Sequence, residues 1–409
     1  MKSWFAPGAF FALIWTVYTL LPILLTQYDM KPLGVLWIFF MVFVVYLGSA
    51  VVTTGIGINK SVSYPTINMH KYFLNNLRFL NVLIILFSIL GLGGVVILII
   101  SLGKELTVFF SLASLSKVAN EYSVLRYSDP SYREPGMAIL LSSFVYASSF
   151  LGGIHYVISL KRYQKFIALF PLIIGVGYSL ILSTRASFYF PCILWISSYI
   201  SIKIFLIKTK FPLFTVRNMI LLGLLITIIT ISYIFLQILR WGASEINMEY
   251  VYSASPFLKS AFLGSPVLFS QWFSEHWSDD IIPTLGAYTN PFYKFFGGQI
   301  MRYESTPLSD ELGSESTVFT LFRDTIEDYT IFGSIFIFLL YGIFWGYSYK
   351  KVIQGKITYL PFLSAFYSIA VASITKFIFG FTTILFAWVM FFIIWCLVNK
   401  KWKIEKCKF

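Results

Sequence analysis

Ten stretches of this chain, each 17 to 28 residues long, contain no Asp, Glu, Lys or Arg. A charge at the bilayer centre costs roughly 2.5 to 3.5 kcal/mol, so such runs are typical of membrane-spanning helices. A helix rises about 1.5 Å per residue, and about 20 residues cross a hydrocarbon core of about 30 Å. The stretches predict helices near 4–26, 33–53, 79–103, 137–160, 166–184, 187–207, 218–239, 330–349, 357–375 and 379–398. We therefore expect an all-α polytopic membrane protein with about ten, at most twelve, transmembrane helices.

The charges between these stretches are unevenly distributed. If the N-terminus is cytoplasmic, 17 of the 18 carboxylates fall on the outer side and only Glu405 falls inside. On the same threading, 19 of the 31 Lys and Arg residues lie inside. This is a positive-inside pattern, so the net charge of +13 indicates membrane topology rather than nucleic-acid binding. An even number of helices places both termini in the cytoplasm.

The composition excludes a soluble protein of several domains, because 58% of the residues are hydrophobic and only 12% are charged. No linker separates a soluble domain, so residues 1–409 are expected to form a single integral membrane domain. The three cysteines have neither a disulfide framework nor metal-ligand spacing. The outer side also lacks an Asp-x-Asp or His-x-x-x-His motif, so we expect no metal and no cofactor.

Residues 240–329 form the largest outer loop and the only segment long enough to cap the helices. Two short amphipathic helices are expected to begin in it, at Ser255-Pro256 and Ser265-Pro266, because Ser followed by Pro favours a helix start. After the second start, aromatic residues and a histidine recur at helical spacing (Phe269, Trp272, Phe273 and His276). This stripe is expected to lie in the headgroup plane with its rings turned to lipid.

Arg185 stands alone between two charge-free stretches of 19 and 17 residues, which leave no slack for a longer loop. It is therefore expected at the outer membrane surface, beside the start of a helix whose dipole favours an anion. A guanidinium in that place suits a diphosphate. The alternative is an arginine that anchors a helical hairpin at the interface.

The large loop also contains Arg240, Arg302 and Arg323, and its last segment, 323–329, enters the membrane directly. Desolvation at the water–lipid boundary is expected to raise a carboxylate pKa there towards that of a useful general base. The alternative is a surface Arg323–Glu327 pair worth roughly 0.3 to 0.5 kcal/mol. His276 is the only histidine on the outer side of this threading, and it is either structural or a proton carrier.

Two segments carry a family resemblance. The stretch GluSerThrValPheThrLeuPheArgAspThrIleGluAspTyrThrIlePheGly at 315–333 resembles the entry to a late helix in bacterial O-antigen polymerases (Wzy, oligosaccharide repeat-unit polymerases). The turn LeuSerThrArgAlaSer at 182–187 resembles their Ser-x-Arg turn between two membrane helices. The layout, with a large outer loop late in the chain, is also similar, although many members of the family have more helices.

The resemblance implies a membrane-embedded glycosyltransferase of the GT-C type in the bacterial inner membrane, with the loop 240–329 in the periplasm. It would transfer a growing glycan from an undecaprenyl-diphosphate donor to a lipid-linked acceptor, and a chain-length regulator is a further expected partner. Arg185 and Arg323 are assigned to the donor diphosphate, with Arg240 and Arg302 as reserves. Glu327, Asp324 or His276 is the candidate base.

Two other functions stay open at this point. An O-antigen ligase would share the large outer loop and the arginine chemistry but would use lipid A core as its acceptor. A flippase or transporter would be expected to show polar breaks in its spans or two homologous halves, and the sequence shows neither clearly.

Overall fold

The computed structural model describes residues 4–26, 28–54, 66–128, 132, 134–207, 216–243, 245–279, 283, 306–307, 315–316 and 320–406. These residues are almost entirely helical. The strands among them are a two-residue antiparallel pair, β1 (Thr306–Pro307) and β2 (Glu315–Ser316).

The chain divides into two compact units that interleave along the sequence. The first unit comprises Met1–Ser63, Ser201–Phe211 and Lys259–Leu385, and the second comprises Tyr64–Ile200, Pro212–Leu258 and Phe386–Phe409. Whether the two units assemble into the single membrane domain expected from the sequence is not tested by this division, so that expectation stays a prediction.

The first unit contains α1 (Pro7–Leu25), α2 (Pro32–Thr53), α12 (Leu321–Ile353), η2 (Ile357–Tyr359), α13 (Leu360–Ala372) and η3 (Ile378–Gly380). The second unit contains α3 (Thr66–Ser101), η1 (Leu106–Phe110), α4 (Leu112–Ser128), α5 (Gly136–Ile158), α6 (Arg162–Ile167), α7 (Phe170–Leu182) and α9 (Val216–Arg240). Three helices contribute residues to both units: α8 (Ala186–Ile207), α10 (Met248–His276) and α14 (Thr382–Lys406).

Eight helices in the described part of the chain are long and apolar enough to cross a membrane. Two further apolar segments are Thr227–Arg240, which is part of α9, and Ile357–Ala372, which comprises η2 and α13. Each of the ten predicted stretches coincides with one of these helices, so the prediction of an all-α fold with many apolar helices is confirmed. Many large apolar side chains on them are exposed, as expected of helices surrounded by lipid.

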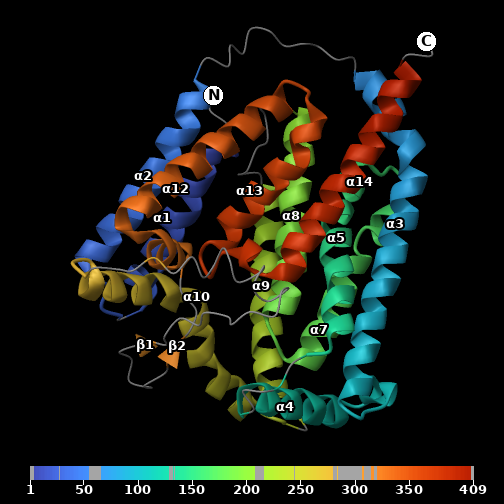
Figure 1. Cartoon of the computed structure of the whole chain (residues 1–409). Helices are drawn as coiled ribbons and strands as arrows, with labels where there is room; N and C mark the ends of the chain where they lie inside the picture. Colours follow the sequence, from blue (N-terminus) through green and yellow to red (C-terminus); the bar gives the residue numbers. More distant parts are fainter. Residues whose placement is uncertain are drawn as a thin grey trace. The chain divides into compact units, whose positions relative to one another are not determined.

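Helices α1, α2 and α12 pack side by side in the first unit (Figure 1). The contact between α2 and α12 depends on glycines, because a Cβ atom added at Gly48 would lie 2.5 Å from the Leu339 carbonyl oxygen. A Cβ atom at Gly342 would likewise collide with the Val45 carbonyl oxygen. Small residues allow two helix backbones to approach this closely, which stabilises a membrane helix pair through van der Waals contact.

Helix α10 differs from the expectation of two short helices, because a single helix runs from Met248 to His276 through both Ser-Pro pairs. A proline inside a helix removes one helical hydrogen bond, and here the helix continues through Pro256 and Pro266. The aromatic stripe is also not turned to lipid. Phe269, Trp272 and Phe273 are buried inside the first unit, where Phe273 stacks on Trp37 of α2 and Phe269 lies against Phe322 of α12.

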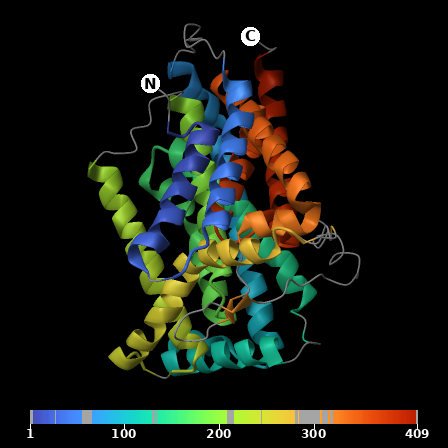
Figure 2. The ribbon, with the colours of Figure 1, turned by 90° about the vertical axis from the view of Figure 1, so that its left-hand side faces the viewer.

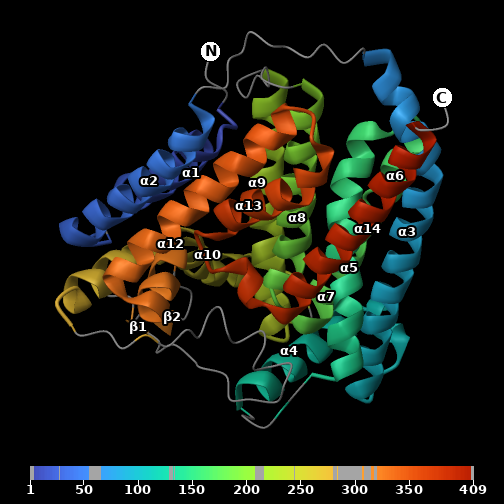
Figure 3. The same cartoon turned by 45° about the horizontal axis from the view of Figure 1, so that its top comes forward.

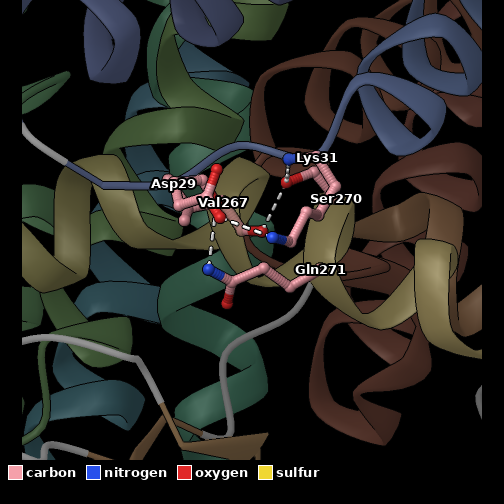
Figure 4. Close-up of polar contacts among 5 residues, drawn as sticks. All are labelled: Asp29, Lys31, Val267, Ser270 and Gln271. Atoms are coloured by element: carbon pink, nitrogen blue, oxygen red, sulfur yellow. Dashed lines mark hydrogen bonds and ion pairs between the residues drawn. The ribbon is translucent and has the colours of Figure 1, made fainter.

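Polar contacts fasten the last part of α10 to the turn between α1 and α2 (Figure 4). The Gln271 side-chain amide donates to the Asp29 carbonyl oxygen at 3.0 Å, and the Lys31 backbone N–H donates to Ser270 Oγ at 3.2 Å. Gly34 meets the backbone of Ser270 so closely that any larger residue would collide. The C-terminal end of α10 is therefore fixed within the first unit.

The long helix α12 is interrupted at Thr330, whose φ of 66° and ψ of 177° are not helical. A positive φ is a genuine outlier for a β-branched residue. The break divides a short head, residues 321–329, from the apolar remainder that was predicted to begin at 330. The head is tied to the end of α13, because the Leu321 N–H donates to the Ser373 carbonyl oxygen at 2.9 Å.

In the second unit α3 and α5 run side by side, and α7 packs against both (Figure 3). Helix α4, which the sequence analysis did not predict, lies across the direction of α3 (Figure 2) and contacts α7 and α9. Tyr122 of α4 donates to Glu134 Oε1 at 2.5 Å, and burial together with this carboxylate raises the pKa of Tyr122. Helix α4 also packs against the turn between α7 and α8, because Ser183 Oγ donates to the Ala119 carbonyl oxygen.

Candidate functional site

The turn between α7 and α8 has an unusual backbone conformation. Ser183 ends α7 with a φ of 45°, and among the described residues only Thr330 is another non-glycine residue with positive φ. Strained conformations of this kind cost about 1 to 3 kcal/mol and persist only where the surroundings enforce them. Here Ser183 Oγ donates to the Ala119 carbonyl oxygen at 3.3 Å, and Ser179 Oγ donates to the Thr184 carbonyl oxygen at 2.9 Å.

Arg185 lies in the same turn, two residues after Ser183, and is half-buried. Its Nη2 donates to Gln237 Oε1 at 2.5 Å, and its guanidinium lies over the ring of Tyr233, with 3.7 Å between Cζ and the ring centroid. Both partners come from α9 and are almost fully buried. The side chain of Arg185 is therefore held against α9.

Arg240, at the end of α9, is brought to the same turn. Its Nη2 donates to the Ser183 carbonyl oxygen at 3.0 Å, and its own carbonyl oxygen accepts a 2.6 Å hydrogen bond from the Asn120 side chain. Two of the predicted arginines thus meet at one short turn, which also precedes the N-terminus of α8. Guanidinium groups and helix N-termini both favour anions, so the chemistry of this turn is of a kind that suits a phosphate or diphosphate group.

The head of α12 positions the second group of predicted residues, in the first unit. Arg323 Nε donates to Glu327 Oε1 at 2.6 Å, and the two side chains are only 4% and 16% exposed. The predicted i,i+4 pair is therefore present, but it is not a pair on a solvated surface. The Arg323 guanidinium also lies over the Trp272 ring, 4.9 Å from its centroid.

His276 also contacts Trp272. Its ring stacks on Trp272, with 5.4 Å between centroids, and its Nδ1 is 2.9 Å from the Trp272 carbonyl oxygen. A carbonyl oxygen can only accept, so this hydrogen bond places a proton on Nδ1, and in the neutral ring Nε2 is then the acceptor. Trp272 thus joins Arg323 of α12 to His276 of α10, and we call these three residues with Glu327 the Trp272 cluster.

Asp324 points elsewhere. It is buried, and its Oδ2 accepts a 3.2 Å hydrogen bond from the Phe377 backbone N–H, just after the end of α13. This contact, together with the Leu321–Ser373 hydrogen bond, ties the head of α12 to the chain between α13 and η3. Asp324 therefore has a structural role at this junction, and it is not part of the Trp272 cluster.

Arg302, the remaining predicted residue, lies outside the described residues. Three residues of the site were not predicted: Tyr233, Gln237 and, as a partner for Arg323, Trp272. A signal for two of them was present, because Tyr233, Gln237 and Arg240 recur at i, i+4 and i+7 on one face of an otherwise apolar helix. Gln237 carries no charge, so a search limited to charged residues does not detect it.

In the part of the chain that the structure describes, no three His, Cys, Asp or Glu side chains are grouped as metal ligands. Comparison of the sequence with models of known protein families and with characterised proteins found no match, and comparison of the fold with solved structures found none either.

Proposed function

We propose that this chain is a membrane glycosyltransferase that polymerises undecaprenyl-diphosphate-linked oligosaccharide repeat units, such as those of O-antigen. The observation that carries the proposal is the Trp272 cluster, in which the Arg323–Glu327 ion pair and His276 meet on one indole ring. Arg323 and Glu327 lie in the segment that resembles the O-antigen polymerases. A carboxylate, an imidazole and a guanidinium together suit proton transfer beside a developing charge.

The reaction can be written with these groups. The acceptor sugar's hydroxyl oxygen attacks the anomeric carbon of the donor glycan, and its proton passes to a base, which we assign to Glu327, with His276 as the alternative. The bond from the anomeric carbon to the diphosphate oxygen breaks, and undecaprenyl diphosphate leaves with the bonding electrons. Holding both lipid-linked substrates in one membrane plane supplies a high effective concentration.

The leaving diphosphate needs positive hydrogen-bond donors, and the turn at 183–187 supports this role. Arg185 and Arg240 meet there, on the second segment that resembles the family. Arginine binds phosphate groups through a planar fork of parallel hydrogen bonds. We propose that this turn of the second unit binds a lipid-linked diphosphate. Within the first unit, we propose that Arg323 stabilises negative charge beside Glu327.

The proposal includes an orientation in the membrane. Ten helices would cross the bacterial inner membrane, both termini would be cytoplasmic, and residues 240–329 would face the periplasm in a GT-C-like arrangement. The charge asymmetry of the sequence supports this orientation. The described helices support ten crossings only if Thr227–Arg240 and Ile357–Ala372 also span the membrane.

Deletion of the gene tests the function directly. Without chain growth, ligation of single units should continue, so lipopolysaccharide should carry one repeat unit instead of a ladder of chain lengths. Expression of the wild-type chain should restore the ladder. Complete loss of the surface glycan would contradict polymerase activity and would favour a ligase or a flippase.

A further inference from the structure

One face of α9 carries the contacts that orient Arg185. Tyr233 and Gln237 are one helical turn apart, and they hold the same guanidinium from two directions. The Cζ atom of Arg185 lies over the ring of Tyr233, and the amide oxygen of Gln237 accepts a hydrogen bond from Nη2. A planar cation held on one face and at one edge has little freedom to rotate.

The chemistry of the two partners matters as much as their position. Gln237 and Tyr233 are neutral, so they hold the guanidinium without adding a negative charge beside it. A glutamate at position 237 would accept the same hydrogen bond but would form an ion pair. Neutral partners are therefore suited to a cation that must attract a second, negative ligand.

The partners are themselves fixed. Tyr233 Oη donates to the Phe257 carbonyl oxygen at 2.6 Å, and the Tyr233 side chain is 1% exposed. Gln237 is buried as well, and Arg240, one turn further along α9, donates to the Ser183 carbonyl oxygen beside the turn. The same face of α9 thus sets both the orientation of Arg185 and the path of the backbone that carries it.

We propose that Gln237 and Tyr233 are positioning residues that orient Arg185 for a diphosphate without placing a negative charge beside it. This inference rests on the proposed function, because it gives Arg185 a diphosphate ligand. Gln237 fixes one edge of the guanidinium without adding a charge, and Tyr233 supplies the ring over which the guanidinium lies.

The test uses the full-length protein in detergent, with inorganic pyrophosphate as the probe. The unfolding temperature is measured with and without pyrophosphate, because a ligand that binds the folded state raises it. The variants are Arg185→Lys, Gln237→Glu and Gln237→Leu. Gln164→Leu, at a buried glutamine of α6 in the same unit, is the matched control for loss of a buried amide.

The inference predicts opposite effects of Gln237→Glu on two readouts. The unfolding temperature without ligand should stay the same or rise, because the Arg185 hydrogen bond gains a charged acceptor, whereas the affinity for pyrophosphate should fall at least tenfold. If Gln237 had only a structural role, the two readouts would change together, because a variant that keeps its unfolding temperature would also keep its affinity for pyrophosphate. Gln237→Leu should weaken binding less than Gln237→Glu does, and Gln164→Leu should leave it unchanged.

Tyrosine variants separate the ring from the hydroxyl. Tyr233→Phe keeps the ring under the guanidinium and should retain most of the binding, whereas Tyr233→Leu should lose it. If Arg185→Lys abolishes the pyrophosphate effect but Gln237→Glu and Tyr233→Leu keep it, the positioning inference is wrong and the proposed role of Arg185 stands. If the wild-type protein shows no effect, or Arg185→Lys retains it, the diphosphate role itself fails and this inference fails with it.

Discussion

The guanidinium of Arg323 lies over the indole ring of Trp272, with 4.9 Å between Cζ and the ring centroid, and both side chains are buried. A cation–π contact contributes about 0.5 to 1 kcal/mol at an exposed site and about 2 kcal/mol or more when it is desolvated. The two residues come from α12 and α10, so this contact joins elements that are far apart in the sequence.

A double-mutant cycle measures that contact. Trp272→Leu and Arg323→Met, alone and combined, should show a coupling energy of about 1 to 2 kcal/mol in the free energy of unfolding, because the cation and the ring stabilise each other only when both are present. Trp272→Phe should retain part of the coupling. Additive effects of the two single substitutions would contradict the stacking.

Glu327→Gln tests the proposed base. Glutamine keeps the length of the side chain and an acceptor oxygen for Arg323 Nε, but it cannot take a proton from the acceptor sugar. Loss of a general base typically costs about a hundredfold to ten-thousandfold in rate, so the ladder of glycan chain lengths should disappear while the protein level stays normal. Glu249→Gln, at an exposed carboxylate of α10, should leave the ladder intact. A normal ladder in Glu327→Gln would leave His276 and Asp324 as the candidate bases.

Arg185→Lys distinguishes a diphosphate ligand from a membrane anchor. Lysine keeps the charge but loses the planar fork and the stacking on Tyr233, so polymer growth should fall by roughly a hundredfold or more, equivalent to about 2.7 to 4 kcal/mol. An anchor at the interface would be replaced well by lysine, which reaches the headgroups equally easily. Long glycan chains at wild-type protein level would therefore remove Arg185 from the site.

The glycine contact between α2 and α12 predicts a stability effect that does not depend on function. Gly342→Ala places a methyl group against the Val45 carbonyl oxygen, so the helices must separate, and the free energy of unfolding should fall by about 1 to 3 kcal/mol. Gly177→Ala in α7 is the matched control, because no atom lies within 4 Å of the added methyl group. It should be neutral or slightly stabilising, since alanine favours helices.

Reporter fusions test the proposed orientation in the membrane. Fusions after Ser305 and after Phe409, two positions outside the described residues, should report the periplasm and the cytoplasm respectively. The expected result follows from the distribution of Lys and Arg. A cytoplasmic signal at Ser305 would overturn the threading and the outer location of residues 240–329.

The helices were predictable from the sequence because a charge inside a membrane is costly, and that cost leaves long charge-free runs. The packing of α10 was not predictable in the same way. An aromatic stripe such as Phe269, Trp272 and Phe273 fits a lipid surface or a protein interior equally well, and only the tertiary structure distinguishes them. The two strained residues, Ser183 and Thr330, also carry no local signal, because neither serine nor threonine favours a positive φ.

The candidate site was partly predictable for a related reason. Charged residues such as Arg185 and Arg323 are conspicuous in an apolar chain, and the i,i+4 spacing of Arg323 and Glu327 indicated their ion pair. The neutral partners Gln237 and Tyr233 are not conspicuous. Asp324 is a charged residue and is therefore easy to notice in the sequence, but its sequence position does not reveal its partner. Its carboxylate accepts a hydrogen bond from the Phe377 backbone N–H, not from Arg323 next to it in the chain.

The contacts between α10 and α12 have a consequence for the assembly of the first unit. Phe269 lies against Phe322, and Trp272 lies under Arg323, so side chains from distant parts of the sequence meet within one unit. The entropic cost of bringing two parts of a chain together grows by only about 0.6 kcal/mol for each doubling of the number of residues between them. The free energy of this packing therefore depends far more on the side chains that meet than on how many residues separate the two helices.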